Sequence, residues 1–519
     1  MTPSGPAPST GTAARTATST WPRFAAAVAA GLLLACARPP VDVGLLGLVA
    51  LAPLWWAWRD ASPGRAALLG LVAGVAYYGV LVSWVWYFGA IAIAPLVLVL
   101  AASWAGTGAV VAWLAQRGVR SPFVLAAVWV LFETVIGRWP VGGLSWGEVG
   151  YTLHGVGFGR ALASWGGVLL ASYVAVTCSA LLVDVVVAAR TRRVAAIRGV
   201  VIGAVALVAV VVVADVARFT PKPTGTLRYA LLQGNDKDRE LTQQEIDTEY
   251  LTRSHLALAA TLRGRYDLIV FPESSLDNDP EEDPPTRAAL VQVAREHGAD
   301  VLANAITTDA RDRSFNTNLL YEPNGMLQGT YSKQHLVPFG EYIPFESVFG
   351  HIGATRQIQT LFTHGHGDTI FRVAGKPVGS IICFESAFGP LVRGFVRKGA
   401  QAIVVTTNNR SYRRSSNSAQ HVETSQMRAA ETARPVLHAS ISGITAVFDA
   451  SGHELRHTRL FHDAVVTGTA TTTTGQTPYV RYGDWVVWGS GLALAGAVAV
   501  AISRRRLAGP RTRSTGDGR

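Results

Sequence analysis

The chain has 519 residues, of which 49% are hydrophobic and only 16% are charged, and its mean hydropathy is +0.26. This composition is too apolar for an ordinary soluble protein and indicates a membrane protein. Three cysteines give neither a disulfide framework nor a paired-cysteine zinc site. The net charge of +11 is concentrated in arginine clusters that flank apolar runs, which favours a membrane-topology signal over a nucleic-acid partner.

The N-terminal half is predicted to form a membrane domain. Residues 1–22 are rich in Ser, Thr, Pro, Ala and Gly and are expected to form a disordered cytoplasmic tail. A transmembrane helix needs about 20 apolar residues. Seven apolar segments give a transmembrane domain over 23–217, at about 23–37, 43–58, 65–88, 90–116, 122–138, 160–189 and 197–217. The first two are short enough to form a hairpin instead, and an eighth apolar segment, 485–503, lies near the C-terminus.

The positions of the arginines predict the orientation. Arginines lie in every second connection between the apolar segments, while the connections after segments three and five are nearly free of Lys and Arg. Because positively charged loops stay in the cytoplasm, both termini are expected there, with 504–519 as a basic tail. The block 218–484 is then expected outside the cytoplasm. The connecting arginines are Arg59, Arg65, Arg117, Arg120, Arg190, Arg192, Arg193 and Arg198.

The block 218–484 has the pattern of a separate α/β domain. Short apolar runs bounded by turn residues predict strands, and longer amphipathic stretches predict helices between them. The predicted helices are 241–262, 285–297 and 418–433. The predicted strands are 227–235, 266–274, 299–306, 376–386, 400–409 and 435–449.

Three reactive side chains follow predicted strands of this domain. Glu273 follows "LIVFP", Lys333 lies in "YSKQHLVPFGEYIPF", and Cys383 follows "GSII". A carboxylate can deprotonate a thiol, and a lysine can stabilise the oxyanion of a tetrahedral intermediate, so this set suits acyl transfer. Taken singly, each residue has a structural explanation, since a lone cysteine at a strand end is more often a small core residue.

These motifs resemble a known family. "FPES", "YSKQHLVPFGEYIPF" and "ICFES" are similar to the three signature regions of the nitrilase superfamily, which carry its Glu, Lys and Cys in this order. Over residues 23–503 the chain resembles the apolipoprotein N-acyltransferase family. That resemblance implies a nitrilase-like αββα sandwich inserted between transmembrane helices seven and eight of an eight-helix bundle. It also implies a multi-pass protein of a bacterial plasma membrane that needs no cofactor and works as a monomer.

The resemblance also implies a reaction. Glu273 takes the proton of Cys383, whose thiolate attacks an acyl ester of a membrane phospholipid, and Lys333 stabilises the oxyanion. The α-amino group of a diacylglyceryl-cysteine at the N-terminus of an apolipoprotein then attacks the thioester. Glu341 in "PFGEY" and Glu385 after the nucleophile are similar to supporting carboxylates of the family. Cys383 is therefore expected to hold more thiolate than Cys36 or Cys178, which lie in apolar segments, and to meet water at least transiently.

Four further residues are weak substrate-binding candidates. Glu133 and Arg138 end the fifth segment, where ionisable groups are functional or paired with each other. Trp146 reads as an interfacial aromatic residue. Asn409 begins "NRSYRR", where many members of the family carry an Asp-Trp pair, so the substrate preference of this chain is in question.

Other polar patterns have simpler explanations. The spacing of Arg428, Glu431 and Arg434 is explained by ion pairing on a helix surface. "THGHGD" places His364 and His366 two residues apart with no further ligand cluster nearby, so no metal site is expected there.

Two other functions use the same features. A membrane-tethered amidase would use the triad on a soluble amide, but such a substrate needs no membrane. A non-catalytic membrane scaffold for a polyprenyl-phosphate mannosyltransferase would not need an intact triad.

Overall fold

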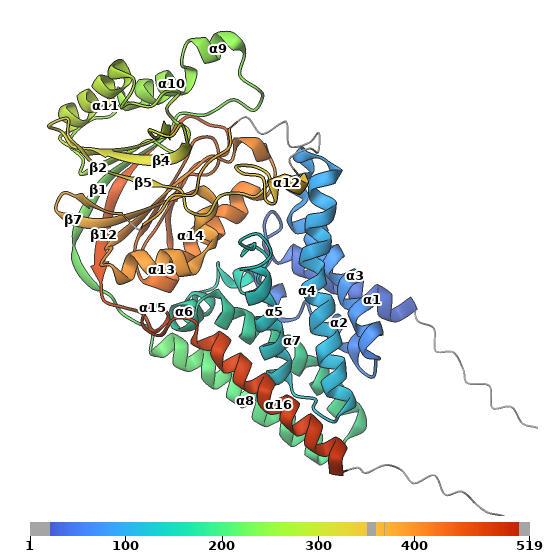
Figure 1. The fold of residues 1–519 in the computed structure, drawn as a ribbon. Helices are drawn as coiled ribbons and strands as arrows, with labels where there is room; N and C mark the ends of the chain where they lie inside the picture. The colour runs from blue at the N-terminus through green and yellow to red at the C-terminus, as the bar shows by residue number, and fades with distance from the viewer. Residues whose placement is uncertain (1–20, 350–359, 368, 508–519) are drawn as a thin grey trace, which may run out of the picture.

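The protein has a bundle of apolar helices at one end and a two-sheet α/β domain at the other (Figure 1). The structure, a computed structural model, describes residues 21–349, 360–367 and 369–507. The terminal tails predicted for 1–22 and 504–519 therefore lie mostly outside the described residues. The first helix begins at Trp21 and the last ends at Leu507, so each extends slightly beyond its predicted segment.

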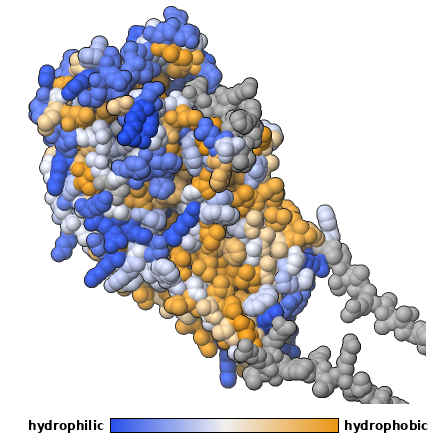
Figure 2. All heavy atoms as spheres, viewed as in Figure 1, coloured by the Kyte–Doolittle hydropathy of each residue, from blue (hydrophilic) through white to orange (hydrophobic). Residues whose placement is uncertain are grey.

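The apolar segments of the sequence form helices. Within the described ranges, five helices are apolar enough, by length and composition, to cross a membrane: α3 (Pro63–Leu81), α4 (Ala90–Gln116), α7 (Val168–Thr191), α8 (Val194–Val216) and α16 (Trp485–Leu507). Figure 2 shows apolar side chains over much of the visible surface of the bundle and hydrophilic ones over the α/β domain. The shorter apolar helices are α1 (Trp21–Cys36), α2 (Ala52–Trp58), preceded by a 3-10 turn, and α5 (Pro122–Ile136).

The predicted sixth segment, 160–189, is not one helix. It is divided into α6 (Gly157–Gly166) and α7, and Gly167 between them has a φ of +73°. A Cβ atom at Gly167 would lie 2.8 Å from the ring of Tyr479, so glycine is required by both conformation and space. The break turns α6 toward the α/β domain, where it contacts α14 and α15.

The arginine-bearing connections meet at one end of the helix bundle. Arg59 pairs with Asp184 at 3.0 Å, and Arg120 pairs with Asp60 at 2.7 Å. Arg504 on α16 donates a hydrogen bond to the carbonyl of Gly118. This end lies away from the α/β domain, at the bottom of Figure 1.

The α/β domain contains two six-stranded sheets. The first has the order β12-β1-β2-β3-β4-β5 and the second β11-β10-β9-β8-β7-β6. The first comprises β1 (Lys222–Gln233), β2 (Leu268–Val270), β3 (Asp300–Thr308), β4 (Ser314–Tyr321), β5 (Leu327–Ser332) and β12 (Ala464–Thr474). The second comprises β6 (Ile370–Val373), β7 (Lys376–Ile382), β8 (Ala402–Thr407), β9 (Val436–Ser440), β10 (Ala446–Phe448) and β11 (Glu454–His457).

Helices cover the outer face of each sheet, which gives the four-layered αββα arrangement that the resemblance implied. One buried apolar cluster lies between the sheets, and another lies under the helices that cover the first sheet. The covering helices are α10 (Tyr250–Ala259) and α11 (Pro284–His297) on the first sheet, and α13 (Gly389–Arg397) and α14 (Asn417–Thr432) on the second. Short helices α9 (Gln243–Asp247), α12 (Glu346–Phe349) and α15 (Pro478–Tyr482) complete the domain.

Each predicted strand overlaps at least one observed strand, and the predicted strand 435–449 is divided into β9 and β10, but β4, β5, β6, β11 and β12 were not predicted. The predicted helix 241–262 is divided into α9 and α10 at Glu249, whose φ is +52°.

Helix α14 joins the two parts of the molecule. Gln420 on α14 accepts hydrogen bonds from Trp84 Nε1 at 3.1 Å and Trp146 Nε1 at 2.9 Å. Glu423 on α14 receives a bidentate ion pair from Arg38, with contacts of 2.9 and 2.7 Å to one oxygen. Because α14 lies between the second sheet and the helix bundle, its polar side chains are buried rather than solvated.

This burial corrects the prediction of surface ion pairing at Arg428, Glu431 and Arg434. All three side chains are buried. Arg428 pairs with Glu431 at 3.0 Å, while Arg434 donates its hydrogen bonds to backbone carbonyls, including Ala400 at 2.7 Å and Gly475 at 2.7 Å.

Candidate active site

Glu273, Lys333 and Cys383 come together between the two sheets. Glu273 follows β2, Lys333 follows β5 and Cys383 follows β7. All three are buried, with side-chain exposures of 5% for Glu273 and 1% for Lys333, and a residue exposure of 8% for Cys383.

Lys333 is held by two carboxylates. Its Nζ donates to Glu341 Oε1 at 2.6 Å and to Glu273 Oε1 at 3.3 Å. Burial alone would lower the pKa of Lys333, but the negative charges of Glu273 and Glu341 outweigh it and hold the pKa well above its usual value. The side chain is therefore a fixed ammonium group in a dry site, where a positive charge acts strongly on a developing oxyanion.

Backbone and amide donors fix Glu273. Its Oε1 also accepts a hydrogen bond from Asn316 Nδ2 at 2.7 Å, and its Oε2 accepts one from the backbone N–H of Asn408 at 2.6 Å. Asn304 in turn donates to Asn316 Oδ1 at 2.8 Å, which orients the amide. Sequence reasoning missed Asn316 because its strand, β4, was not predicted.

Cys383 lies at a sharp turn. Its φ of +52° is unusual for a side chain other than glycine, and it begins a short 3-10 helix, Cys383–Ala387, directly after β7. Strained backbone of this kind clusters at functional sites. His421 supports the turn, because its Nε2–H donates to the Cys383 carbonyl at 2.9 Å, and burial lowers the pKa of His421 to about 4, so its ring is neutral.

The thiol of Cys383 is protonated in the resting structure. Burial, followed by the Glu273 carboxylate, raises the pKa of Cys383 to about 12, against the opposing charge of Lys333. The expectation that Cys383 holds more thiolate is therefore wrong for this state, while transient contact of the sulfur with water stays a prediction. The physical reason is the enclosure of the sulfur among two carboxylates and one lysine, which sequence alone does not show.

Glu385 acts through the backbone around the triad. Its Oε1 accepts N–H hydrogen bonds from Gln334 at 2.7 Å and His335 at 3.1 Å, and its Oε2 accepts one from Ile382 at 2.8 Å. The Tyr331 hydroxyl donates to both oxygens at 2.9 Å. Glu385 thus ties the loop that carries Lys333 to the turn that carries Cys383.

The loop that departs from the family pattern closes one side of the site. Asn409 is buried and donates to Asn417 Oδ1 at 2.8 Å, so it supports the loop. The Tyr412 ring packs against Trp84 at 4.8 Å and Phe88 at 5.8 Å, between the site and the helix bundle. The arginines of this loop pair with acidic residues of 236–240, as in the 2.9 Å contact from Arg410 to Glu240.

Of the two alternatives that the sequence left open for Glu133 and Arg138, the structure excludes the mutual pair. Glu133 Oε1 accepts from Trp129 Nε1 at 2.8 Å, while Arg138 pairs with Asp484 at 2.5 Å. Trp146 is not interfacial. It is buried, and its ring stacks near Phe384 at 6.3 Å, behind the nucleophile.

One cluster has the spacing of metal ligands among the described residues. It consists of Asp42, His154 and Glu423, and it was not predicted. Arg38 already occupies Glu423, and His154 Nε2 lies 3.0 Å from Asp42 and 3.2 Å from Glu423, so the cluster is accounted for as an ion-pair network. His364, from the rejected metal motif, instead hydrogen-bonds the carbonyl of Gln334 at 2.8 Å.

Two protein-family models match the chain. The apolipoprotein N-acyltransferase N-terminal domain matches residues 30–181, and the carbon-nitrogen hydrolase domain matches residues 230–479. The second match agrees with the αββα domain, and the first covers most of the helix bundle. Together they span both parts of the molecule.

Whole-length relatives give the same picture. An apolipoprotein N-acyltransferase of Methylococcus capsulatus is 31% identical over 92% of this chain and 96% of its own length. One from Geobacter metallireducens is 30% identical over 93% of this chain and 95% of its own length. Among solved structures, a CN-hydrolase superfamily protein from Xanthomonas campestris aligns with 47% of this chain and 90% of its own, with 21% identity and a TM-score of 0.37.

Proposed function

Since this chain belongs to the apolipoprotein N-acyltransferase family, we propose that it moves an acyl chain from a membrane phospholipid to the α-amino group of a lipoprotein N-terminus. The observation that carries the proposal is the buried Glu273–Lys333–Cys383 set, which lies between the two sheets of an αββα domain that packs against an apolar helix bundle. A thiol nucleophile allows the acyl chain to be held as a thioester between two substrates.

The first step forms that thioester. With a pKa near 12 for Cys383, ionising the thiol before attack at pH 7 would cost about 7 kcal/mol. We therefore infer that Glu273 takes the proton as the sulfur attacks the ester carbonyl. The C–O bond of the ester breaks, the lysophospholipid leaves as an alcohol with the proton from Glu273, and the acyl chain stays on Cys383.

Lys333 and Glu341 serve both steps. The Lys333 ammonium lies beside Glu273 and stabilises the oxyanion of each tetrahedral intermediate. Glu341 fixes the lysine and accepts the Val337 N–H at 2.7 Å, so it positions the charge without reacting itself. In the second step the α-amino group of the diacylglyceryl-cysteine attacks the thioester, Glu273 takes a proton from the nitrogen, and the Cys383 thiol is restored.

We further propose the membrane topology. The apolar segments cross the bilayer eight times in residues 23–217 and 485–503, with 218–484 inserted between the seventh and eighth spans and exposed outside the cytoplasm. The support is the clustering of Arg59, Arg120 and Arg504 at the end of the bundle away from the α/β domain. Positive residues favour the cytoplasmic side.

Cysteine labelling tests this orientation. A cysteine at exposed Met326, in the α/β domain, should react with a membrane-impermeant thiol reagent in spheroplasts. A cysteine at exposed Arg192, between α7 and α8, should react only after the membrane is broken. Reaction in the reverse order would overturn the orientation. We also propose that the protein works as a monomer, without a nucleic-acid partner or a cofactor.

Mass spectrometry of lipoprotein N-termini tests the function. Cells that depend on this protein should carry N-acylated lipoproteins, and cells with Cys383→Ala should carry diacylated lipoproteins with a free α-amino group. A tethered amidase or a scaffold would leave the N-termini unchanged by the substitution. Equal N-acylation in the two strains would contradict the proposal.

A further inference from the structure

A cavity of about 480 Å³ lies between the helix bundle and the α/β domain, apart from the triad. None of Glu273, Lys333 and Cys383 lines it. The first residues of α7 and α16, such as Val168 and Val486, form part of its wall. The cavity therefore lies at the level where two apolar helices emerge beside the α/β domain.

One side of the cavity carries two buried carboxylates. Glu133 and Glu148 are each 6% exposed. Oε1 of Glu133 accepts hydrogen bonds from Trp129 Nε1 and the Val149 N–H, both at 2.8 Å, and Oε1 of Glu148 accepts one from the Ser145 hydroxyl. Within the described residues, neither Oε2 atom has a hydrogen-bond partner. The Ser172 hydroxyl also contacts the Glu133 carboxylate.

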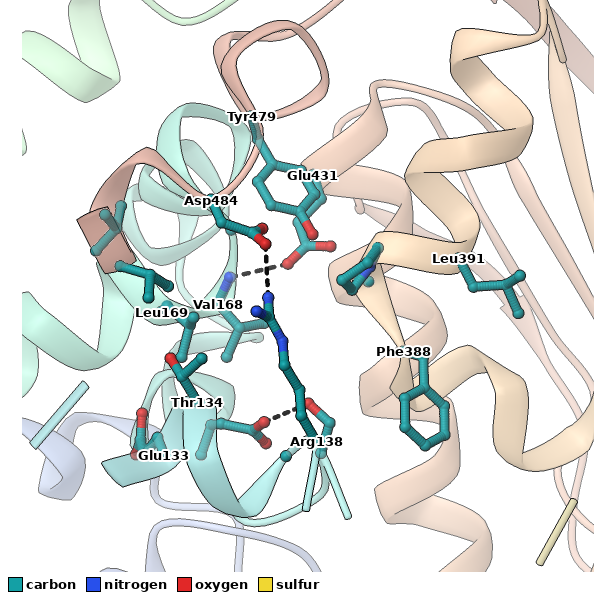
Figure 3. Close-up of a pocket in the computed structure, with 18 of the residues that line it drawn as sticks. Glu133, Thr134, Arg138, Val168, Leu169, Phe388, Leu391, Glu431, Tyr479 and Asp484 are labelled. Carbon is teal, nitrogen blue, oxygen red and sulfur yellow. Dashed lines mark hydrogen bonds and ion pairs between the residues drawn. The ribbon is translucent and has the colours of Figure 1, made fainter. Parts of the chain in front are cut away.

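The arginines in the wall are already paired with other carboxylates. Figure 3 shows Arg138 reaching Asp484, at 2.5 Å, rather than Glu133. Arg428 pairs with Glu431 at 3.0 Å. Among the described residues, neither Glu133 nor Glu148 has an ion pair with these arginines, and buried polar atoms without partners are costly.

We propose that this cavity binds a primary ammonium group carried by a membrane amphiphile. An ammonium group has three N–H donors and a positive charge, which matches the two buried carboxylates in the wall of the cavity. Part of the wall is apolar, and Phe388 and Leu391 lie on the other side of Arg138 from Glu133 in Figure 3. Such a wall suits the aliphatic part of the same ligand.

The chemistry selects among lipid headgroups. A trimethylammonium group has no N–H donor and is wider, so a choline headgroup leaves both oxygens without partners. A glycerol headgroup brings no positive charge. The ammonium can come from an ethanolamine phospholipid or from the α-amino group of a diacylglyceryl-cysteine, and the second source rests on the proposed function. Binding at this cavity does not require the thioester.

Native mass spectrometry of the full chain in detergent tests the proposal. The Cys383→Ala variant is used so that no lipid is consumed. The probes are dioleoyl phosphatidylethanolamine, its mono- and dimethyl derivatives, dioleoyl phosphatidylcholine and dioleoyl phosphatidylglycerol. We expect affinity to fall with each added methyl group, and phosphatidylcholine to bind at least tenfold more weakly than phosphatidylethanolamine. Equal binding of these two lipids would overturn the proposal.

Substitution locates the binding. In the same background, Glu148→Gln and Glu133→Gln should each weaken phosphatidylethanolamine binding at least tenfold and leave phosphatidylglycerol binding unchanged. The matched control is Glu296→Gln, an exposed carboxylate on α11. The methylation series needs no substitution in the cavity, so it remains decisive if either variant folds poorly. Headgroup selectivity that survives both substitutions would place the ammonium elsewhere and overturn the assignment.

A synthetic diacylglyceryl-cysteine dipeptide identifies the source. If it displaces phosphatidylethanolamine and loses affinity with Glu148→Gln, the cavity receives the acceptor amine. If it does neither while phosphatidylethanolamine keeps its dependence on Glu148, the ligand is the phospholipid headgroup. Binding in both arms is measured on a protein without its nucleophile, so a failure of the acyl-transfer proposal would not affect the result.

Discussion

Lys333 makes its shorter carboxylate contact with Glu341, at 2.6 Å, and not with the proposed base Glu273, at 3.3 Å. Glu341 is therefore a positioning residue for the ammonium group. Displacement of a catalytic group by about 1 Å can cost roughly 10²-fold in rate. We expect Glu341→Gln to lower the acyl-transfer rate by about that factor with little change in phospholipid KM. Exposed Glu346, the first residue of α12, provides the control, Glu346→Gln, which should retain the rate. A Glu341→Gln enzyme with unchanged kcat would remove this role.

Replacement of the lysine itself should be more severe. Loss of one oxyanion-stabilising donor typically costs about 10²–10³ in rate. Lys333→Met also leaves Glu273 and Glu341 facing each other without a cation, so the loss should reach at least that range. Single-turnover acylation of Cys383 by a labelled phospholipid measures it. Acylation within a few-fold of the parent would show that another group stabilises the oxyanion.

Glu385 should matter for structure rather than for chemistry. Glu385→Gln replaces one acceptor oxygen with an amide donor opposite backbone N–H groups, and each buried N–H left unpaired costs about 1–3 kcal/mol. Tyr331→Phe removes only the hydroxyl donor to Glu385 and should be milder. Thermal unfolding in detergent compares the two variants. Equal unfolding temperatures in both variants and the parent would show that these bonds do not stabilise the loop.

The buried pair between Arg38 and Glu423 should hold the helix bundle to the α/β domain. Breaking a buried pair costs about 3–5 kcal/mol because one charge is left without a partner. Arg38→Met should therefore destabilise strongly, and the double variant with Glu423→Met should recover part of the loss. Arg313→Met, which breaks an exposed pair with Asp309, should cost about 0–1 kcal/mol. Equal losses for the exposed and buried arginines would contradict this account.

Acid should weaken the α/β domain through its buried histidines. Burial lowers the pKa of His421 and of His255 to about 4. Between pH 6.5 and 4 the unfolded chain binds more protons at these residues than the folded chain, so stability falls as the pH falls. From pH 7 to 5 the loss is about 2 kcal/mol for each histidine. His255→Gln, outside the active site, should flatten the dependence of unfolding temperature on pH; an unchanged slope would contradict a neutral His255.

The triad could be predicted from the sequence because Glu273, Lys333 and Cys383 lie in motifs with a recognisable order. Strand β4 was missed because "SFNTNLLY" mixes asparagines with apolar residues, and those asparagines are buried only because they hydrogen-bond across the sheet. Because β4 was not predicted, Asn316, whose amide orients Glu273, was not predicted as a site residue either.

Pairings between distant segments were also beyond the sequence. The i, i+3 spacing of Arg428 and Glu431 suits a solvated helix as well as a buried one, and only the packing of α14 under the bundle decides between them. Likewise, Arg138 pairs with Asp484, which is 346 residues away in the sequence, and not with the nearby Glu133. The high pKa of Cys383 depends on enclosure by three separate loops, so its motif alone favoured the opposite expectation.

Intact-protein mass spectrometry tests the central claim that Cys383 carries the acyl chain. Purified protein is incubated with a phospholipid of one defined acyl chain and no acceptor. The account predicts a mass gain equal to one acyl group, released by neutral hydroxylamine as expected for a thioester, mapped to the Cys383 peptide and absent from Cys383→Ala. Addition of a diacylglyceryl-cysteine peptide should then remove the acyl group and return it as an N-acylated product. An N-acylated product formed at the parental rate by Cys383→Ala would contradict the account.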